Sequence, residues 1–150
     1  MRDVVVAVAI LAALTSGCMG DDGGDKSFAE EADAVCSDAQ TQMSRVQQPQ
    51  DPRDPLQVAL FLERAVPVAR AQNRRLRELE RPEDQRTEIN AFLGALEAEV
   101  DAAERMLAAS RREDREAVQA ALQESALAGA QTRQFAQRLD LQVCGGGGGG

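Results

Sequence analysis

Histidine, tryptophan and tyrosine are all absent from this chain of 150 residues. Without histidine, neither a Ser-His-Asp triad nor a Cys-His nucleophile pair can form. The Glu-x-x-His ligand sets of di-iron carboxylate bundles are excluded for the same reason. We therefore expect a protein that is not an enzyme and that has no catalytic residues.

Basic residues are fewer than acidic ones, 17 against 25, which gives a net charge of −8. Such a chain is a poor nucleic-acid binder, because phosphate contacts need a surplus of lysine and arginine. With so many carboxylates some pairs arise by chance, so a solvated surface explains them better than acid/base catalysis. The acidic run Asp21–Asp25 lacks the register of a calcium loop. We expect no metal, no cofactor and no nucleic-acid partner.

Long apolar runs are limited to Val4–Leu14 near the start of the chain. Its length fits the roughly 7–15 residues of a signal-peptide core and falls short of the roughly 20 needed to span a bilayer. The sequence that ends in Cys18, Leu14-Thr15-Ser16-Gly17-Cys18, resembles the signal peptide of a bacterial lipoprotein. The resemblance implies removal of residues 1–17, a diacylglyceryl group (and palmitate) on Cys18, and anchoring at the outer face of the cell membrane. The alternative is an ordinary secretory peptide with an unmodified cysteine.

Cysteine is scarce, and the three that exist can be assigned. If Cys18 carries lipid, Cys36 and Cys144 remain as a pair in an oxidising compartment, where disulfides persist. Such a bond would stabilise the fold by roughly 4–5 kcal/mol in the chain-entropy model. Two cysteines that prefer each other also leave zinc without ligands. Two free thiols remain possible, as does a Cys18–Cys36 bond if lipidation fails.

Apolar residues at spacings of three and four predict four helices within residues 27–144. Ser27 and Glu30 resemble a capping box at the first start, and Asp114 is a candidate N-cap for the fourth helix. Pro67 should kink or divide the second helix, over about 56–79. Pro82 is well placed as the first residue of the third helix, which puts acidic residues in its first turn.

Short connections favour antiparallel neighbours and therefore an all-α, up-down-up-down four-helix bundle. In that topology the first helix starts where the fourth ends, so Cys36 and Cys144 can meet. One phenylalanine on each helix is expected in the core: Phe28, Phe61, Phe92 and Phe135. Residues 18–26 are read as a flexible tether and the glycines of 145–150 as a disordered tail.

Three short motifs resemble those of a family of small uncharacterised actinobacterial exported proteins. They are Ala32-Asp33-Ala34-Val35-Cys36, Cys144-Gly145, and the Leu-x-x-Leu-x-x-Pro stretch over residues 76–82. The resemblance implies a disulfide-tied helical domain in the cell envelope and brings no established activity.

Two surface patterns are candidates for contacts. Four arginines at spacings of 4, 3 and 4 share one face of the second predicted helix: Arg70, Arg74, Arg77 and Arg81. We expect either contact with anionic lipid, at about 1 kcal/mol per cation, or a solvated face paired with Glu78 and Glu80. Prolines at every third residue of 49–55 favour a polyproline II segment, a form used in recognition, although loop punctuation alone explains them.

The function that these features favour is binding at the cell surface, to another envelope protein. The alternative is a small-ligand or stress sensor whose core admits an apolar molecule. A pocket lined by Leu96, Ser125, Gly129 and Thr132 would favour the alternative, and a filled core would count against it.

Overall fold

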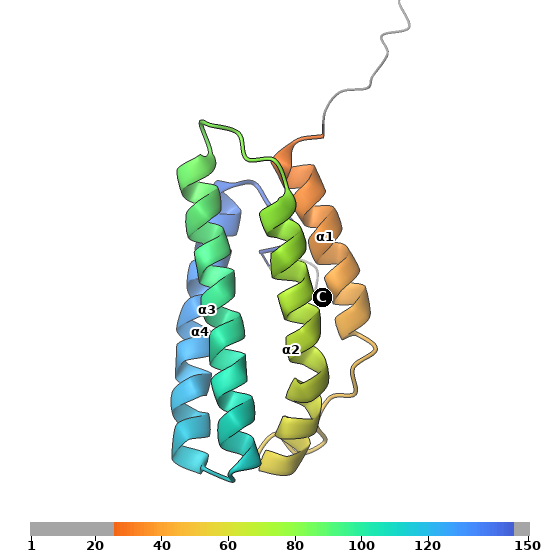
Figure 1. The fold of residues 1–150 in the computed structure, drawn as a ribbon, viewed down its shortest axis with the longest axis vertical. Helices are drawn as coiled ribbons and strands as arrows, with labels where there is room; N and C mark the ends of the chain where they lie inside the picture. Colours follow the sequence, from red (N-terminus) through yellow and green to blue (C-terminus); the bar gives the residue numbers. More distant parts are fainter. Residues whose placement is uncertain (1–25, 146–150) are drawn as a thin grey trace, which may run out of the picture.

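The computed structural model describes residues 26–145, so the predicted signal peptide, Cys18 and most of the tether and glycine tail lie outside it. Four helices pack side by side in an antiparallel bundle (Figure 1): α1 (Phe28–Met43), α2 (Pro55–Glu78), α3 (Arg86–Arg111) and α4 (Arg115–Arg138). Residues 26–145 contain no strand. The predicted all-α four-helix bundle is confirmed.

Side-chain caps define where three of the helices begin. Ser27 accepts the N–H of Glu30 while the Glu30 carboxylate accepts the N–H of Ser27, which confirms the predicted capping box. Asp114 accepts the N–H of Ala117 at 3.0 Å, as predicted. Asp54, which had not been assigned a role, caps α2 by accepting the N–H of Leu56 at 2.9 Å. The sequence therefore marks these helix starts with polar side chains that satisfy free N–H groups.

The structure corrects the predicted position of Pro82 and one of the two effects predicted for Pro67. The third helix begins at Arg86 and not at Pro82, because the Gln85 N–H bonds to the Pro82 carbonyl oxygen (3.2 Å) and closes a turn before the helix. The acidic residues after Pro82 therefore precede the first turn. Pro67 does not divide α2, which runs unbroken. Pro67 and Glu63, whose carbonyl loses its helical partner, are both exposed, so water can reach this turn.

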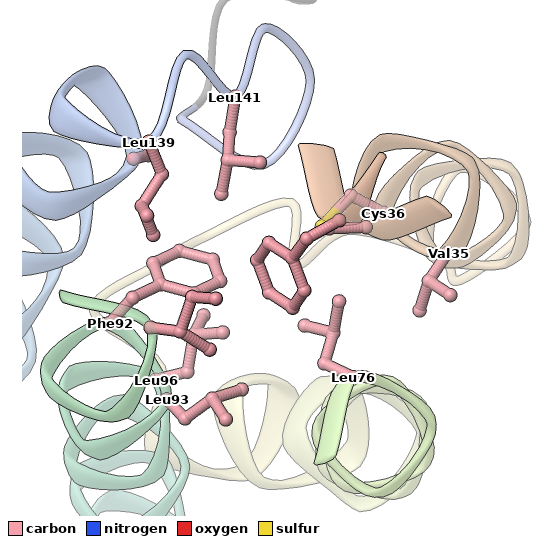
Figure 2. Packing of buried hydrophobic residues seen from close by; sticks show 12 residues of the cluster. Val35, Cys36, Leu76, Phe92, Leu93, Leu96, Leu139 and Leu141 are labelled. Atoms are coloured by element: carbon pink, nitrogen blue, oxygen red, sulfur yellow. The ribbon is translucent and has the colours of Figure 1, made fainter. Parts of the chain in front are cut away.

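The large apolar side chains gather at the end of the bundle where α1 begins and α4 ends. Figure 2 shows Leu76, Phe92, Leu139 and Leu141 converging from α2, α3 and the segment after α4. Phe28 and Phe92 are buried, whereas Phe61 and Phe135 are only partly buried. The prediction of four core phenylalanines is therefore right in full for two of them.

Most of the buried side chains in the opposite half of the bundle are small. Its buried residues include Ala59, Ala65, Ala102, Ala109 and Ala121. α1 is also the shortest helix, at 16 residues against 24 for α2, a difference of about 12 Å at 1.5 Å per residue. Figure 1 shows α1 ending well before the far end of the bundle. Because these side chains are small and α1 ends early, side chains fill less of the interior in this half of the bundle.

Leu122 on α4 does not lie where the spacing of apolar residues would place it. The 3–4 spacing along this helix includes Leu122 among the inward positions, but its side chain is 50% exposed, whereas its neighbour Ala121 is buried. The buried face of α4 runs through Ala121, Ala128, Thr132 and Ala136. Because the buried face of α4 consists of these small side chains, α4 can lie close against α3. The larger Leu122 then lies on the exposed side of the helix.

Candidate ligand-binding cavity

A cavity of about 480 Å³ lies between the helices, next to the cluster of large core residues. All four helices and the segment after α4 contribute to its wall. The lining residues include Phe61, Asn73, Leu96, Glu99, Ser125 and Thr132. Its volume is within the roughly 300–1,000 Å³ typical of small-molecule sites, and such sites recur between the helices of bundles.

The cavity exists because the residues around it are too small to fill the space. Ala65 and Ala69 of α2, Ala103 of α3 and Ser125 of α4 line it. Met43, the last residue of α1, also lines it, so the wall on that side ends with the helix. Large side chains at these positions would close the interior to the density usual in protein cores.

Two buried polar side chains line the cavity without an internal partner. Asn73 is 5% exposed and Thr132 is 4% exposed. Neither Asn73 Nδ2 nor Thr132 Oγ1 makes a hydrogen bond to any residue of the described chain. Burying such groups unsatisfied costs about 1–3 kcal/mol each. In native proteins groups of this kind are few, and each calls for an explanation such as a bound water or ion or a functional role.

The charge of the wall is low and negative. Among the described lining residues Glu99 is the only one with an ionisable side chain, since Cys36 and Cys144 are bonded to each other. Glu99 is partly buried. The cavity wall therefore combines apolar side chains with neutral hydrogen-bonding groups and one carboxylate.

Three of the four residues predicted for a core pocket do meet at this cavity: Leu96, Ser125 and Thr132. Gly129 is the exception, because it does not line the wall. A Cβ built on Gly129 would lie 3.5 Å from Arg133 Nη1 and 3.8 Å from Glu99 Oε2, beside the rim and not inside. Asn73 was not predicted, since an asparagine in a helix carries no signal of whether it faces inward.

The predicted disulfide is present and forms part of the same wall. Cys36 and Cys144 are bonded, with Cα atoms 5.2 Å apart, and both line the cavity. Gln72 Nε2 donates to Cys36 Sγ at 3.2 Å. Gln40 Nε2 donates to the carbonyl oxygen of Val143 at 3.3 Å. The segment after α4 is thus held against α1 and α2 beside the cavity.

Asp33 is a second clamp on this segment, and its role had not been predicted. Its carboxylate accepts the backbone N–H groups of Gln142 (2.8 Å), Val143 (2.8 Å) and Cys144 (3.1 Å). Asp33 and Cys36 lie three residues apart on α1 and so share one face of the helix. The Ala-Asp-Ala-x-Cys motif therefore places a carboxylate and a disulfide-bonded cysteine side by side, and both hold the backbone of residues 142–144.

The predicted arginine stripe lies along the junction of α2 and α3, but only Arg70, Arg74 and Arg77 are on α2, because the helix ends at Glu78 and Arg81 follows it. Three of its four members bond to α3: Arg70 pairs with Glu104, Arg77 with Glu97 (2.9 Å) and Arg81 with Asn90 (3.0 Å). The partners of the ion pairs are thus on the neighbouring helix and not the expected Glu78 and Glu80. About half of the Arg70 and Arg77 side-chain surface stays exposed, at 56% and 45%. Contact of Arg70, Arg74, Arg77 and Arg81 with anionic lipid stays a prediction.

The proline segment forms a turn over part of its length. The N–H of Asp54 bonds to the carbonyl oxygen of Asp51 at 3.1 Å, and Gln57 Oε1 accepts the N–H groups of Gln50 and Asp51. Pro55 is the first residue of α2. These contacts make residues 50–54 a helix-entry turn instead of a continuous polyproline II segment.

Residues 26–145 include no helix that is long and apolar enough to cross a membrane. The same residues hold no group of three or more potential metal ligands. Comparisons with family models, curated proteins and solved structures find no match to this chain.

Proposed function

We propose that this protein binds a small, mostly apolar molecule in the cavity between its helices while lipid on Cys18 holds it at the outer face of the cell membrane. The observation that carries the proposal is the cavity itself. It combines a ligand-sized volume of about 480 Å³ with buried polar side chains that lack an internal partner. Apolar walls with a few placed polar groups are typical of small-molecule sites.

The membrane part of the proposal is supported by the sequence that ends in Cys18. Lipid attached to Cys18 would be connected to the start of α1 through the short predicted tether. The start of α1 lies at the end of the bundle that holds the large core side chains. The cavity wall on the α1 side extends to Met43, at the other end of that helix. The anchor and the proposed binding site are therefore separated along α1, and attachment leaves the cavity free.

Anchoring is tested with Cys18→Ser in the native host. The wild-type chain should incorporate labelled palmitate and sediment with membranes, because two or more acyl chains on one residue bind a bilayer stably. The variant should lose the label and appear in the soluble fraction. Recovery of unlabelled wild-type protein from the soluble fraction would reject the anchor without affecting the cavity.

Ligand binding is tested with the neutral fluorophore N-phenyl-1-naphthylamine and the purified protein. The wild type should enhance its emission saturably, because the probe is apolar and uncharged. Ser125→Phe should abolish the enhancement by filling the cavity that Ser125 lines. The matched control is Ala126→Phe on the next residue of α4, which is exposed and outside the wall. Equal binding by the wild type and both variants would place the probe elsewhere on the molecule.

A second candidate function is contact with an envelope protein through the start of α2. Leu56 and Leu60 are 67% and 54% exposed and lie four residues apart, so they share one face of the helix. Exposed leucines that lie together can mark an interaction site. Leu56→Lys with Leu60→Lys should then remove a cross-linked partner from intact cells, with Leu127→Lys as the control at another exposed leucine (69%).

A further inference from the structure

We infer that the cavity selects neutral amphiphiles, molecules with an apolar body and an uncharged amide, carbonyl or hydroxyl group, and rejects fatty-acid carboxylates. This inference rests on the proposed binding function and names the class of ligand. It is carried by Asn73 and Thr132, by the absence of a cation from the described cavity wall, and by Glu99.

Asn73 and Thr132 approach the cavity from two helices that do not pack against each other. The helix pairs in extensive contact are α3 with α4, α2 with α3, and α1 with α2, and the pair α2 and α4 is not among them. Asn73 on α2 and Thr132 on α4 therefore line the cavity from different sides. A ligand between the two helices can reach both.

Both residues also lie at the same depth in the bundle. Asn73 is five residues before the end of α2 at Glu78, and Thr132 is six residues before the end of α4 at Arg138. The two helices run in the same direction, so both groups lie near the cluster of large core residues. Phe61, in contrast, lies near the start of α2. We place the polar group of the ligand at the Asn73 end and its apolar body toward Phe61.

The chemistry of the two side chains matches a neutral group. An asparagine amide offers donors and an acceptor, and a threonine hydroxyl offers one donor and accepts as well. An amide or alcohol can bond to both without bringing a charge into the bundle. These contacts would satisfy Asn73 Nδ2 and Thr132 Oγ1, which no described residue satisfies.

A carboxylate has no compensating charge in this cavity. No arginine or lysine is among the described lining residues, and Glu99 adds a negative group of its own. Asn73 also lines the neighbouring recess between α2 and α3, whose arginines are Arg70, Arg74 and Arg77. Arg70 and Arg77 already pair there with Glu104 and Glu97, and none of the three lines the cavity. A carboxylate that enters the cavity loses part of its hydration and gains no cation from the wall, so a ligand of the same chain length should bind less well as an acid.

The test measures displacement of N-phenyl-1-naphthylamine from the full protein by decanamide, decanol and decanoate. Decanamide and decanol should compete, and decanoate at pH 8 should be at least about tenfold weaker because its charge stays unpaired. Thr132→Val keeps the shape of the side chain and removes the hydroxyl. It should weaken decanamide and decanol roughly 3- to 10-fold, the effect of one lost hydrogen bond.

Controls separate this selection from general damage to the cavity. Thr132→Ser, which keeps the hydroxyl, should retain affinity for decanamide, and Ala126→Phe, which lies outside the cavity wall, should bind the fluorophore as the wild type does. Equal displacement by all three compounds, or an equal loss of fluorophore and decanamide in Thr132→Val, would overturn the inference while the cavity stays a binding site. Failure of the wild type to bind the fluorophore or any of the three compounds would reject the binding function and the selection with it.

Discussion

Replacing Asp33 with alanine tests how the end of the chain is held beside the cavity. One carboxylate accepts three backbone N–H groups from residues 142–144, two of them in partly buried surroundings. A hydrogen bond to a charged group contributes about 1.5–3 kcal/mol, and bonds that share one acceptor do not add fully. We expect Asp33→Ala to lower the free energy of unfolding by about 2–3 kcal/mol, because the freed N–H groups lose their acceptor.

Asp38→Ala is a matched control on the same helix. Asp38 pairs with Arg75, and both side chains are 49% exposed, so this surface pair should contribute no more than about 1 kcal/mol. Urea unfolding followed by circular dichroism, with the disulfide intact in all samples, measures both variants. The reasoning is refuted if Asp33→Ala costs no more than Asp38→Ala.

Three further predictions concern stability and pH. Reducing the Cys36–Cys144 bond should lower the urea midpoint by the equivalent of roughly 4–5 kcal/mol in the chain-entropy model; an unchanged midpoint would contradict that role. Ser110→Ala should leave the midpoint equal or raise it by up to about 1 kcal/mol, since the buried Ser110 Oγ has no partner in the described chain, and a clear loss would reveal a partner. Hydrogen bonds from the Gln57 side chain and the Leu56 N–H lower the pKa of Asp54 below its ordinary 3.8. Its stabilisation is therefore full above that value and is lost as pH falls through the lower pKa of the folded state. A pH titration of unfolding should show a weaker acid dependence in Gln57→Leu, and an identical acid limb would exclude this cap.

Local features of the fold were the ones that sequence could predict. Ser27 with Glu30 and Asp114 were assigned correctly because a cap depends only on residues within one turn. Pro82 misled because proline suits both the first position of a helix and the turn before it. The contacts of the surrounding loop decide which of these two positions Pro82 takes, and the spacing of apolar residues does not show those contacts.

The cavity could be predicted only in part, because it depends on what is missing from several helices at once. The alternative function named a pocket lined by Leu96, Ser125, Gly129 and Thr132, and all of these except Gly129 line the cavity. The sequence did not predict that α2 contributes Asn73 to the cavity wall, because no pattern of residues around Asn73 shows that its side chain faces the interior. Likewise, Asp33 bonds to residues more than one hundred positions away, a contact that only the folded chain brings together.

Mass spectrometry of molecules that copurify with the protein shows whether the cavity holds a ligand. The wild-type protein and Ser125→Phe would be purified from the native host under identical conditions, extracted with organic solvent and compared. The account predicts a neutral amphiphile in near-stoichiometric amount in the wild type and its loss from the variant. Identical extracts from a correctly folded variant and the wild type would contradict a ligand in the cavity.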